Sequence, residues 1–393
     1  MNTAWKMLPL IALIALTTSC SASGASSSDP IGETFTLGIF GNADMDEDID
    51  EKDIAYVDGV IKGTNAATNL SDANYDGKID TNDIEQIEQI IRGEEKKLVF
   101  MDVIGEVETV NKPVKRLVVV MSDAPEVLRA LNAVDKIVGA TVDAKRDGEV
   151  FFPELSNVKS VGKWTSIDHE AVLSTQPDVY MPYTPHATSP SVWPSTKKDK
   201  GELKNKLPGV SIVALDFVTM KTFSENVLKL GYILDKENEA KEFADWYDGY
   251  LTEIKEQTMK IPEDKKPLVF TMTYGKYKTG IPGSRYHELM TISGGRNIAS
   301  DLPIPAGGST TGVTVDPEWV MEQNPDIIIR KDFLETNPCY STDNPRDLVA
   351  TLDDIFNTTE LSNVTAVKNK RVYAIANLLQ TGPHSLMYSP TQF

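Results

Sequence analysis

Carboxylate and amide side chains recur at regular spacing in two twelve-residue stretches near the start of the sequence. Each stretch carries oxygen-bearing side chains at positions 1, 3 and 5 and a carboxylate at position 12. Calcium takes about six to eight hard oxygen ligands, and a loop of this spacing supplies them, with position 7 contributing its backbone carbonyl. The two stretches are therefore predicted to be calcium loops that hold two ions. Their ligands would be Asn42, Asp44, Asp46, Asp48 and Asp53 in the first loop, and Asp72, Asn74, Asp76, Lys78 and Asp83 in the second.

The two predicted loops differ at their sixth position, where a sharp turn favours glycine. The second loop has Gly77 there and the first has Glu47, so the first loop is predicted to be the weaker site. Both loops end in Asp rather than Glu, which shortens the reach of the last ligand. An acidic surface without metal is the alternative interpretation. We favour calcium because the spacing holds twice.

Each predicted loop runs into an apolar helical pattern that ends near a glycine, Gly63 or Gly93. Two such loop-helix units resemble a type I dockerin module over residues 37–93. The resemblance implies calcium-dependent folding and pairing with a cohesin-domain partner. Positions 10 and 11 of the loops, Glu51-Lys52 and Thr81-Asn82, depart from the Ser-Thr pair that the family uses for cohesin recognition, which puts the pairing in doubt.

Length and composition limit what else the chain of 393 residues can do. It is long enough for two or three domains, and its 40% hydrophobic and 25% charged residues are ordinary for a globular protein. A net charge of −19 disfavours nucleic-acid binding, which needs clustered cations. Two cysteines exclude a disulfide framework. The acidity is concentrated in residues 40–93, which hold fourteen Asp and Glu but only four Lys and Arg.

Residues 1–20 are predicted to be an export signal. Lys6 precedes an apolar run of about ten residues, too short to span a bilayer, and small residues lead to Cys20. This pattern resembles a lipoprotein cleavage box, in which Cys20 would carry the lipid, although Thr17 stands where Leu is usual. Ordinary secretion with cleavage nearby is the alternative. Residues 21–36, rich in Ser and Ala, are expected to be a flexible tether.

The remainder of the chain is predicted to form two similar α/β lobes. The segment from Ile167 to Met181 can be laid on the segment from Val315 to Ile329, with five of fifteen positions identical. Each copy begins with a helix-capping Asp and continues through a short helix, a Pro-Asp turn and an apolar strand. An apolar run from Val114 to Met121 adds a further buried strand. One supersecondary unit is thus used once in each lobe.

A long helix is predicted between the two lobes. Apolar residues from Ala240 to Ile254 recur at helical spacing within residues 236–260, and Pro262 follows the end of the pattern. A single rigid helix that joins two lobes would allow them only limited relative motion. The predicted fold is therefore α/β, with two lobes joined by a long helix and preceded by a small all-α module.

The run Val99 to Val120, the two Pro-Asp units and the segment from Ser293 to Ala299 together resemble the substrate-binding proteins of ABC transporters for iron-siderophores, haem and cobalamin. The resemblance covers about residues 97–393. It implies an N-terminal lobe over 94–220, connecting helices over 221–261 and a C-terminal lobe over 262–393. Asn132 departs from the Gly that is common in the family. Because the family usually continues into a final helix beyond Phe393, we expect a truncated C-terminal lobe.

The ligand is expected in a cleft, at the carboxyl ends of the parallel strands. The resemblance implies that Trp164, Tyr183 and Tyr274 face the ligand, and aromatic faces suit a bulky planar complex. Each of them could instead be a core or rim residue, and Lys276 could simply be solvated. Four scattered histidines form no recognisable metal-ligand spacing, which favours a chelated metal over a bare one. The candidate ligand-binding residues are Trp164, Tyr183, His186, Tyr274, Lys276, Tyr277, Arg330 and His384.

Glu170 and Glu318 occupy equivalent places in the two repeat copies. The resemblance implies that one acidic residue per lobe pairs with arginines of the permease. A first-turn glutamate favoured by the helix dipole is the alternative, and both roles can hold at once.

The leading hypothesis is a monomeric, lipid-anchored, extracytoplasmic protein that captures a ferric siderophore, haem or corrinoid and delivers it to an ABC importer. A calcium-dependent cell-surface scaffold that engages a cohesin-like partner is the alternative. An enzyme would need a nucleophile with its base or a cluster of perturbed acids, and we find neither in the sequence. We therefore expect no catalytic residues and no nucleic-acid partner.

Overall fold

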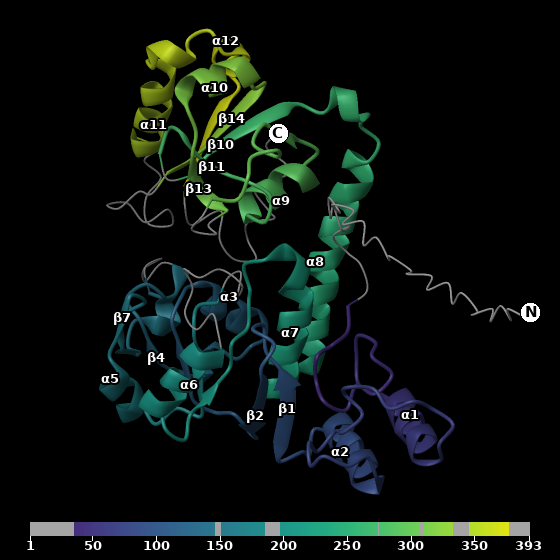
Figure 1. Cartoon of the computed structure of the whole chain (residues 1–393). Helices are drawn as coiled ribbons and strands as arrows, with labels where there is room; N and C mark the ends of the chain where they lie inside the picture. Colours follow the sequence, from purple (N-terminus) through teal and green to yellow (C-terminus); the bar gives the residue numbers. More distant parts are fainter. Residues whose placement is uncertain are drawn as a thin grey trace, which may run out of the picture. The chain divides into compact units, whose positions relative to one another are not determined.

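The computed structural model describes residues 35–145, 151–184, 197–273, 275–305, 310–332 and 346–376 (Figure 1). Ile31–Phe393 form one compact unit. The predicted export signal, Cys20, most of the tether, His186, Tyr274 and His384 lie outside the described residues. Across the described ranges, we find no helix whose length and apolar character would let it cross a membrane.

The N-terminal lobe contains a five-stranded parallel sheet of order β5-β4-β3-β8-β9. The central strand β3 is buried throughout, as the apolar run in the sequence predicts. The strands are β3 (Leu117–Val119), β4 (Ile137–Ala140), β5 (Lys159–Ser160), β8 (Val179–Met181) and β9 (Ser211–Ile212). The helices of this lobe are α3 (Asp123–Ala130), α5 (His169–Ser174) and α6 (Lys197–Lys206). A small hairpin is formed by β6 (Gly162–Lys163) and β7 (Ser166–Ile167).

The C-terminal lobe contains a four-stranded parallel sheet of order β12-β10-β14-β15. Its strands are β10 (Leu268–Met272), β12 (Arg296–Asn297), β14 (Ile327–Asp332) and β15 (Val372–Ala376). Its helices are α9 (Arg285–Ile292), α10 (Pro317–Gln323), α11 (Arg346–Phe356) and α12 (Thr365–Lys368). A short antiparallel pair, β11 (Lys278–Gly280) with β13 (Thr311–Thr314), completes the lobe.

The internal repeat folds in the same way in both lobes. Asp168 and Asp316 cap α5 and α10, and each accepts a backbone N–H with its side chain. Asp178 accepts N–H groups from the two residues that precede β3, at 2.7 and 2.9 Å. Asp326 accepts the N–H of Leu268 at the start of β10, at 2.8 Å. The Pro-Asp turn therefore sets the start of the neighbouring strand in each lobe, which explains why its Asp recurs.

Two long helices follow the N-terminal sheet and pack against each other (Figure 1). They are α7 (Met220–Leu234) and α8 (Glu237–Thr258), so α8 is the predicted long helix, and α7 lies where the connecting helices were expected to begin. Phe223 of α7 stacks on Tyr247 of α8, with ring centroids 4.0 Å apart. Asp235 joins the helices in the left-handed conformation, with φ +58°.

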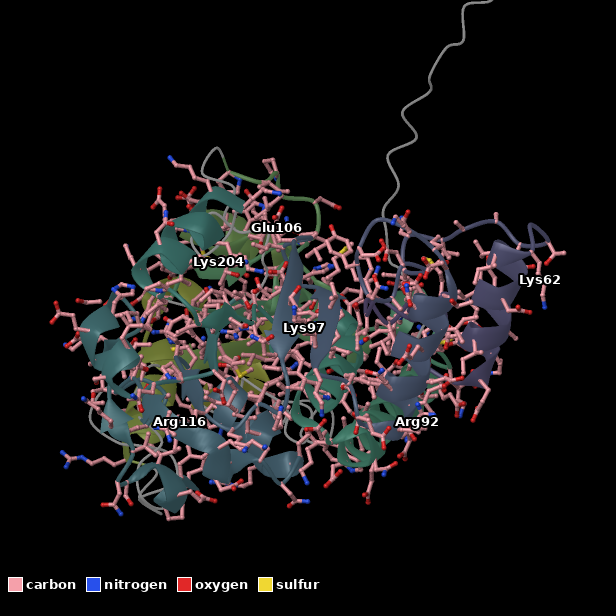
Figure 2. All side chains as sticks on the ribbon, turned by 90° about the horizontal axis from the view of Figure 1, so that it is seen from below. Lys62, Arg92, Lys97, Glu106, Arg116 and Lys204 are labelled. Carbon is pink, nitrogen blue, oxygen red and sulfur yellow. The ribbon has the colours of Figure 1, made fainter. Side chains whose placement is uncertain are left out.

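A further strand precedes β3 in the sequence and lies outside the two lobe sheets. β1 (Lys97–Met101) pairs antiparallel with β2 (Val107–Asn111). Buried ion pairs join this hairpin to α6: the Lys200 ammonium lies 2.5 Å from Asp102 and 2.8 Å from Glu108. In Figure 2, Lys97 and Glu106 mark the hairpin.

The acidic module consists of α1 (Glu51–Ile61), α2 (Thr81–Arg92) and the loops before them. Asp50 and Asp80 each cap a helix and form a capping box with Asp53 or Asp83. Lys62 is the C-cap residue of α1, and Arg92 is the last residue of α2; both are labelled in Figure 2. Most buried apolar residues of the module belong to the same hydrophobic cluster as those of the hairpin, α7 and α8, and Phe40 and Leu70 form a smaller cluster with Val99 of the hairpin. The boundary expected at residue 93 therefore does not separate two hydrophobic cores.

Candidate functional site

A cavity of about 500 Å³ opens in the N-terminal lobe, beyond the carboxyl end of β8. The β6–β7 hairpin, β8 and the ends of α5 and α6 provide its lining. A cavity at the strand ends is where the α/β architecture is expected to bind a ligand. Its ten lining residues are Val120, Trp164, Thr165, Ser166, Ile167, His169, Tyr180, Pro182, Tyr183 and Lys206.

Two of the predicted ligand residues, Trp164 and Tyr183, come together in this cavity. Trp164 lies at the tip of the β6–β7 hairpin, where its backbone N–H donates to Asp143 Oδ2 at 2.8 Å. Its ring meets the Tyr183 ring edge to face, with centroids 6.2 Å apart and planes at 75°. Trp164 is 45% exposed although it is a large aromatic residue. The pair therefore presents aromatic surface at the mouth of a cavity.

The cavity is also lined by three titratable residues that the sequence argument did not select: His169, Tyr180 and Lys206. Burial, and then the nearby Lys206 ammonium, lower the pKa of the His169 imidazole below its usual value. Burial raises the pKa of the Tyr180 phenol. No Asp or Glu lies among the ten lining residues. In the sequence, the only sign that His169 and Tyr180 could be functional was their place in the repeat copy, and for Lys206 it was its place at the end of α6. Neither place shows which face of the fold the side chain occupies.

The described candidates in the C-terminal lobe lie apart from this cavity. The Lys276 ammonium lies 2.7 Å from Asp354 Oδ1 and 3.0 Å from Thr358 Oγ1, so it is bonded to α11 and the turn after it. Tyr277 packs against the core of the lobe, and burial raises the pKa of its phenol. Arg330 lies on β14, and its Nη1 is buried without a hydrogen-bond partner among the described residues. Their roles toward a ligand remain predictions.

A second cavity of about 200 Å³ lies in the C-terminal lobe, between α9 and one face of the sheet. Val269, Ile327, Ile329 and Ile375 line it, together with Tyr286 of α9. Next to this face, the buried Lys331 donates to the Tyr286 hydroxyl and lies 5.1 Å from the centre of its ring. The lining is mostly apolar and contains no charged residue, so it offers nothing to pair with a charged ligand.

The family model described as "Periplasmic binding protein" matches residues 117–378, which cover both sheets and the cavity at Trp164. The chain belongs to the periplasmic binding protein family. A substrate-binding lipoprotein of Bacillus subtilis, named YvrC and described as an uncharacterized ABC transporter protein, is 23% identical over 72% of this chain and 81% of its own length.

Solved structures show the same fold. The TroA-like periplasmic binding protein FepB of Veillonella parvula has a TM-score of 0.59 at 22% identity, over 73% of this chain and 86% of that chain. The molybdate-bound MolA of Haemophilus influenzae has a TM-score of 0.57 at 18% identity, over 74% and 88%. The haem-binding protein RhuT of Roseiflexus has a TM-score of 0.53 at 16% identity, over 71% and 96%. The names of two of these proteins state what they bind, molybdate for MolA and haem for RhuT.

The two glutamates expected to contact the permease are both exposed in this periplasmic binding protein. Glu170 lies in the first turn of α5 and Glu318 in the first turn of α10. Because α5 and α10 are equivalent repeat copies, the two carboxylates occupy matching places in the two lobes. Their location fits the docking role and also the helix-dipole alternative, so docking stays a prediction.

The predicted second calcium loop is folded by its own side chains. Asp72 accepts the N–H groups of Asp76 and Gly77 at 3.0 and 2.8 Å, and Asp76 accepts that of Lys78 at 2.9 Å. Gly77 has φ +89° and Tyr75 has φ +58°, both in the left-handed region. Glycine is therefore required at position 6 of this loop.

The first loop shares part of this arrangement. Met45, at the same fourth position as Tyr75, has φ +67°, whereas Glu47 at position 6 does not have a positive φ. The last carboxylates behave alike: Asp53 and Asp83 are buried, and each accepts N–H groups from positions 3 and 9 of its loop. Burial raises the pKa of Asp53 to about 7. In the ranges that the structure describes, no three His, Cys, Asp or Glu side chains converge as metal ligands.

Proposed function

We propose that this periplasmic binding protein captures a metal chelate, such as a ferric siderophore, haem or a corrinoid, outside the cell membrane and delivers it to an ABC importer. The membership of the family supports capture and delivery, and the name of the Bacillus subtilis relative supports an ABC transporter. The chemistry of the cavity at Trp164 supports the choice of ligand class. A binding protein of this kind performs no covalent step.

The observation that carries the proposal is the aromatic pair of Trp164 and Tyr183 at the mouth of a cavity of about 500 Å³. Aromatic faces contribute large contact area to a bulky planar or macrocyclic ligand. The His169 and Lys206 side chains suit its carboxylate, catecholate or hydroxamate oxygens. A bare divalent cation would instead need carboxylate or clustered nitrogen and sulfur ligands, which the ten lining residues do not include.

Delivery would use the exposed Glu170 and Glu318, one on each lobe. Ligand binding would shift an equilibrium between open and closed arrangements of the lobes, and the permease would recognise the closed one. A lipid on Cys20 would hold the protein at the outer face of the membrane. The name of the Bacillus subtilis relative, a lipoprotein, supports this anchor. Mass spectrometry of the protein purified from its native host would detect the lipid.

The ligand class is tested by titrating the purified chain with ferric siderophores of the catecholate and hydroxamate types, haem, cobalamin, molybdate and bare Fe³⁺, with tryptophan fluorescence as the readout. Trp164 is expected to be quenched by at least one of the chelates and not by the bare ion. A response to molybdate alone would assign the protein to oxyanions. No response to any of these ligands would remove the support for metal-chelate capture.

We also propose that the two loops of the acidic module bind calcium. The support is the twelve-residue spacing, the left-handed residues at position 4 of both loops, and the buried last carboxylates, which an ion would compensate. Equilibrium dialysis against calcium should give two sites in the intact chain. Asp76→Ala should remove one of them, and Asp58→Ala, at a half-buried residue of α1 outside both loops, should remove neither.

One observation supports the alternative function, a calcium-dependent cell-surface scaffold with a cohesin-like partner. Glu51, Lys52, Thr81 and Asn82, at the positions that dockerins use for partner recognition, are all exposed. A pull-down with isolated cohesin domains, in calcium and in chelator, would test it.

A further inference from the structure

The last residue of α6 reaches the cavity at Trp164. Among the ten described lining residues, Lys206 is the only Lys or Arg, and none is Asp or Glu. Leu203, one turn earlier on α6, packs in one apolar cluster with Val120 and Tyr180, which also line the cavity. The position of the Lys206 ammonium therefore depends on how α6 is held against the lobe.

Buried ion pairs hold α6 against the β1–β2 hairpin. The Lys200 ammonium lies 2.5 Å from Asp102 Oδ2 and 2.8 Å from Glu108 Oε2. The three residues are 3%, 4% and 5% exposed, so solvent and salt screen these pairs little. Lys204, one turn along α6, pairs with the same Glu108 carboxylate at 2.7 Å, and Figure 2 shows it next to the hairpin. A shift of α6 would break a buried pair and leave a charge without its partner, which is strongly unfavourable.

Asp102 divides its two carboxylate oxygens between the hairpin turn and α6. Its Oδ1 accepts the backbone N–H groups of Ile104 and Glu106 at 3.1 and 2.9 Å, which closes the turn between β1 and β2. Its Oδ2 accepts from Lys200. The position of α6 is therefore set by a turn whose own geometry is fixed.

The hairpin is in turn hydrogen-bonded to the edge of the N-terminal sheet. The N–H of Val103, in the hairpin turn, donates to the carbonyl of Ala214, just after β9, at 3.1 Å. The Ser211 hydroxyl on β9 donates to the carbonyl of Thr109 on β2, also at 3.1 Å. A continuous series of bonds thus leads from the sheet through the hairpin and Lys200 to α6.

Lys206 also acts on His169, which lines the same cavity. Burial, and then the Lys206 ammonium, lower the pKa of the His169 imidazole, while the adjacent Asp168 carboxylate acts in the opposite direction. Displacing the ammonium removes one of the two causes, so the pKa of His169 should then rise toward its ordinary value. The titration of His169 is therefore a measure of where Lys206 lies, and it needs no ligand.

We propose that Lys200 is a positioning residue of the ligand cavity: its buried ion pairs hold α6 so that the Lys206 ammonium meets an anionic group of the ligand. This inference rests on the proposed function, because it needs a chelate to occupy this cavity. The ligand class that follows is a chelate with ionised oxygens, such as haem with its carboxylates or a ferric tris-catecholate, in preference to a neutral chelate. Lys200 touches no ligand and acts only through Lys206.

The position of Lys206 is tested without ligand, by NMR titration of His169 in the full chain, with His169→Gln to assign its signal. In Lys200→Met and in Lys206→Met, the pKa of His169 should rise, because the ammonium is displaced in the first variant and absent in the second. Lys200→Arg keeps a cation in the network and should titrate as the parent protein does. An equal titration of His169 in the parent and in Lys200→Met would overturn the positioning role.

A matched control is available on α7. Lys229 is also a buried lysine, 4% exposed, and its ammonium pairs with Glu225 at 2.6 Å. Lys229→Met removes a buried ion pair that does not hold α6, so the titration of His169 should stay as in the parent protein. A shift as large as that of Lys200→Met would show a general effect of removing a buried lysine and would overturn the proposal.

A second variant keeps the test valid if Lys200→Met does not fold. Lys200→Met leaves two buried carboxylates without their shared partner, whereas the triple variant Lys200→Met, Asp102→Asn and Glu108→Gln leaves no charge in the network. The triple variant should show the same rise in the pKa of His169. A titration like that of the parent protein would contradict the role of the network.

The action through Lys206 is tested by the affinity for haem and for a ferric tris-catecholate, measured by tryptophan fluorescence. Lys206→Met should weaken the chelate that binds by about 10- to 100-fold, the loss of one charge-assisted hydrogen bond. Lys200→Met should weaken it by up to the same factor, and it should cause no further loss in the Lys206→Met background.

The outcomes separate this inference from the proposed function. Losses that add up in the double variant would show that Lys200 acts by another route, and would overturn its action through Lys206. Unchanged affinity in Lys206→Met would overturn the anionic contact and leave chelate capture standing. Binding of neither haem nor the tris-catecholate would overturn the anionic ligand, and a simultaneous lack of response to cobalamin and hydroxamates would remove the proposed function as well.

Discussion

Replacing Trp164 by alanine tests the ligand site most directly. Trp164 is 45% exposed, and a tryptophan side chain offers about 250 Å² of contact area, so about 110 Å² is available to a ligand. At about 25 cal/mol per Å², covering all of it is equivalent to about 3 kcal/mol. Because about 1.4 kcal/mol corresponds to ten-fold in affinity, Trp164→Ala should weaken chelate binding by about 10- to 100-fold, the lower value applying to half coverage.

The chain offers a matched control in Trp246. It is 44% exposed and lies on α8, where its ring stacks on Phe243 and Tyr250 at 5.7 and 6.2 Å. Trp246→Ala removes a comparable exposed surface that does not line the cavity, so chelate affinity should stay within about two-fold. Both variants would be titrated by isothermal calorimetry with the chelate that quenches the parent protein.

If Trp164→Ala binds the chelate as tightly as the parent, the cavity at the β6–β7 hairpin is not the binding site. If Trp246→Ala loses as much affinity as Trp164→Ala, the loss reflects a general effect of removing a large aromatic residue and not contact with the ligand.

Three further outcomes are expected. Exchanging both Glu170 and Glu318 for Arg should abolish transporter-dependent uptake and leave chelate affinity unchanged; an equal fall in affinity would contradict the docking role. Lys112→Met should lower the free energy of unfolding by about 3–5 kcal/mol, because it leaves a buried carboxylate unpaired. Burial already raises the pKa of that carboxylate, on Glu95, so the folded state holds its proton more tightly than the unfolded chain. The loss of unfolding free energy in Lys112→Met should therefore be smaller at pH 5 than at pH 8. Urea unfolding at the two pH values checks this, and equal losses would contradict it. Burial lowers the pKa of His287, whose Nδ1 lies 3.1 Å from the Asn297 amide, so the unfolded chain binds more protons and stability should fall from pH 7 to pH 5; His287→Gln should flatten this slope, and an unchanged slope would exclude His287 as its source.

The sequence predicted elements well where one segment carried its own signal. The repeat around Asp178 and Asp326 predicted two parallel sheets, because a capping Asp, a short helix, a Pro-Asp turn and an apolar strand are local instructions. Even Gln176 and Asn324, which follow the two helices at equivalent positions, share a positive φ of +48° and +45°. The sequence comparison aligned them without showing that both adopt the left-handed conformation.

Long-range contacts could not be predicted in the same way. Nothing in the pattern around Ile49 or Tyr232 shows that they meet, because each has an ordinary local environment and the contact joins residues 183 positions apart. The same holds for His169 and Lys206, which reach the cavity from two different helices. Lys276 illustrates the converse: its place after a strand suggested a ligand contact, and its bonds to Asp354 and Thr358 depend on α11, far away in the sequence.

The continuous apolar cluster limits how the protein can be divided into fragments. A fragment that starts at residue 94 would expose Leu98 and Phe100 of the hairpin and Leu230 of α7, all of them buried in the intact chain. Exposed apolar surface of that kind favours aggregation. Nor could the acidic segment be moved to another protein as a tag, since the side chains of the hairpin, α7 and α8 that share its apolar cluster would stay behind.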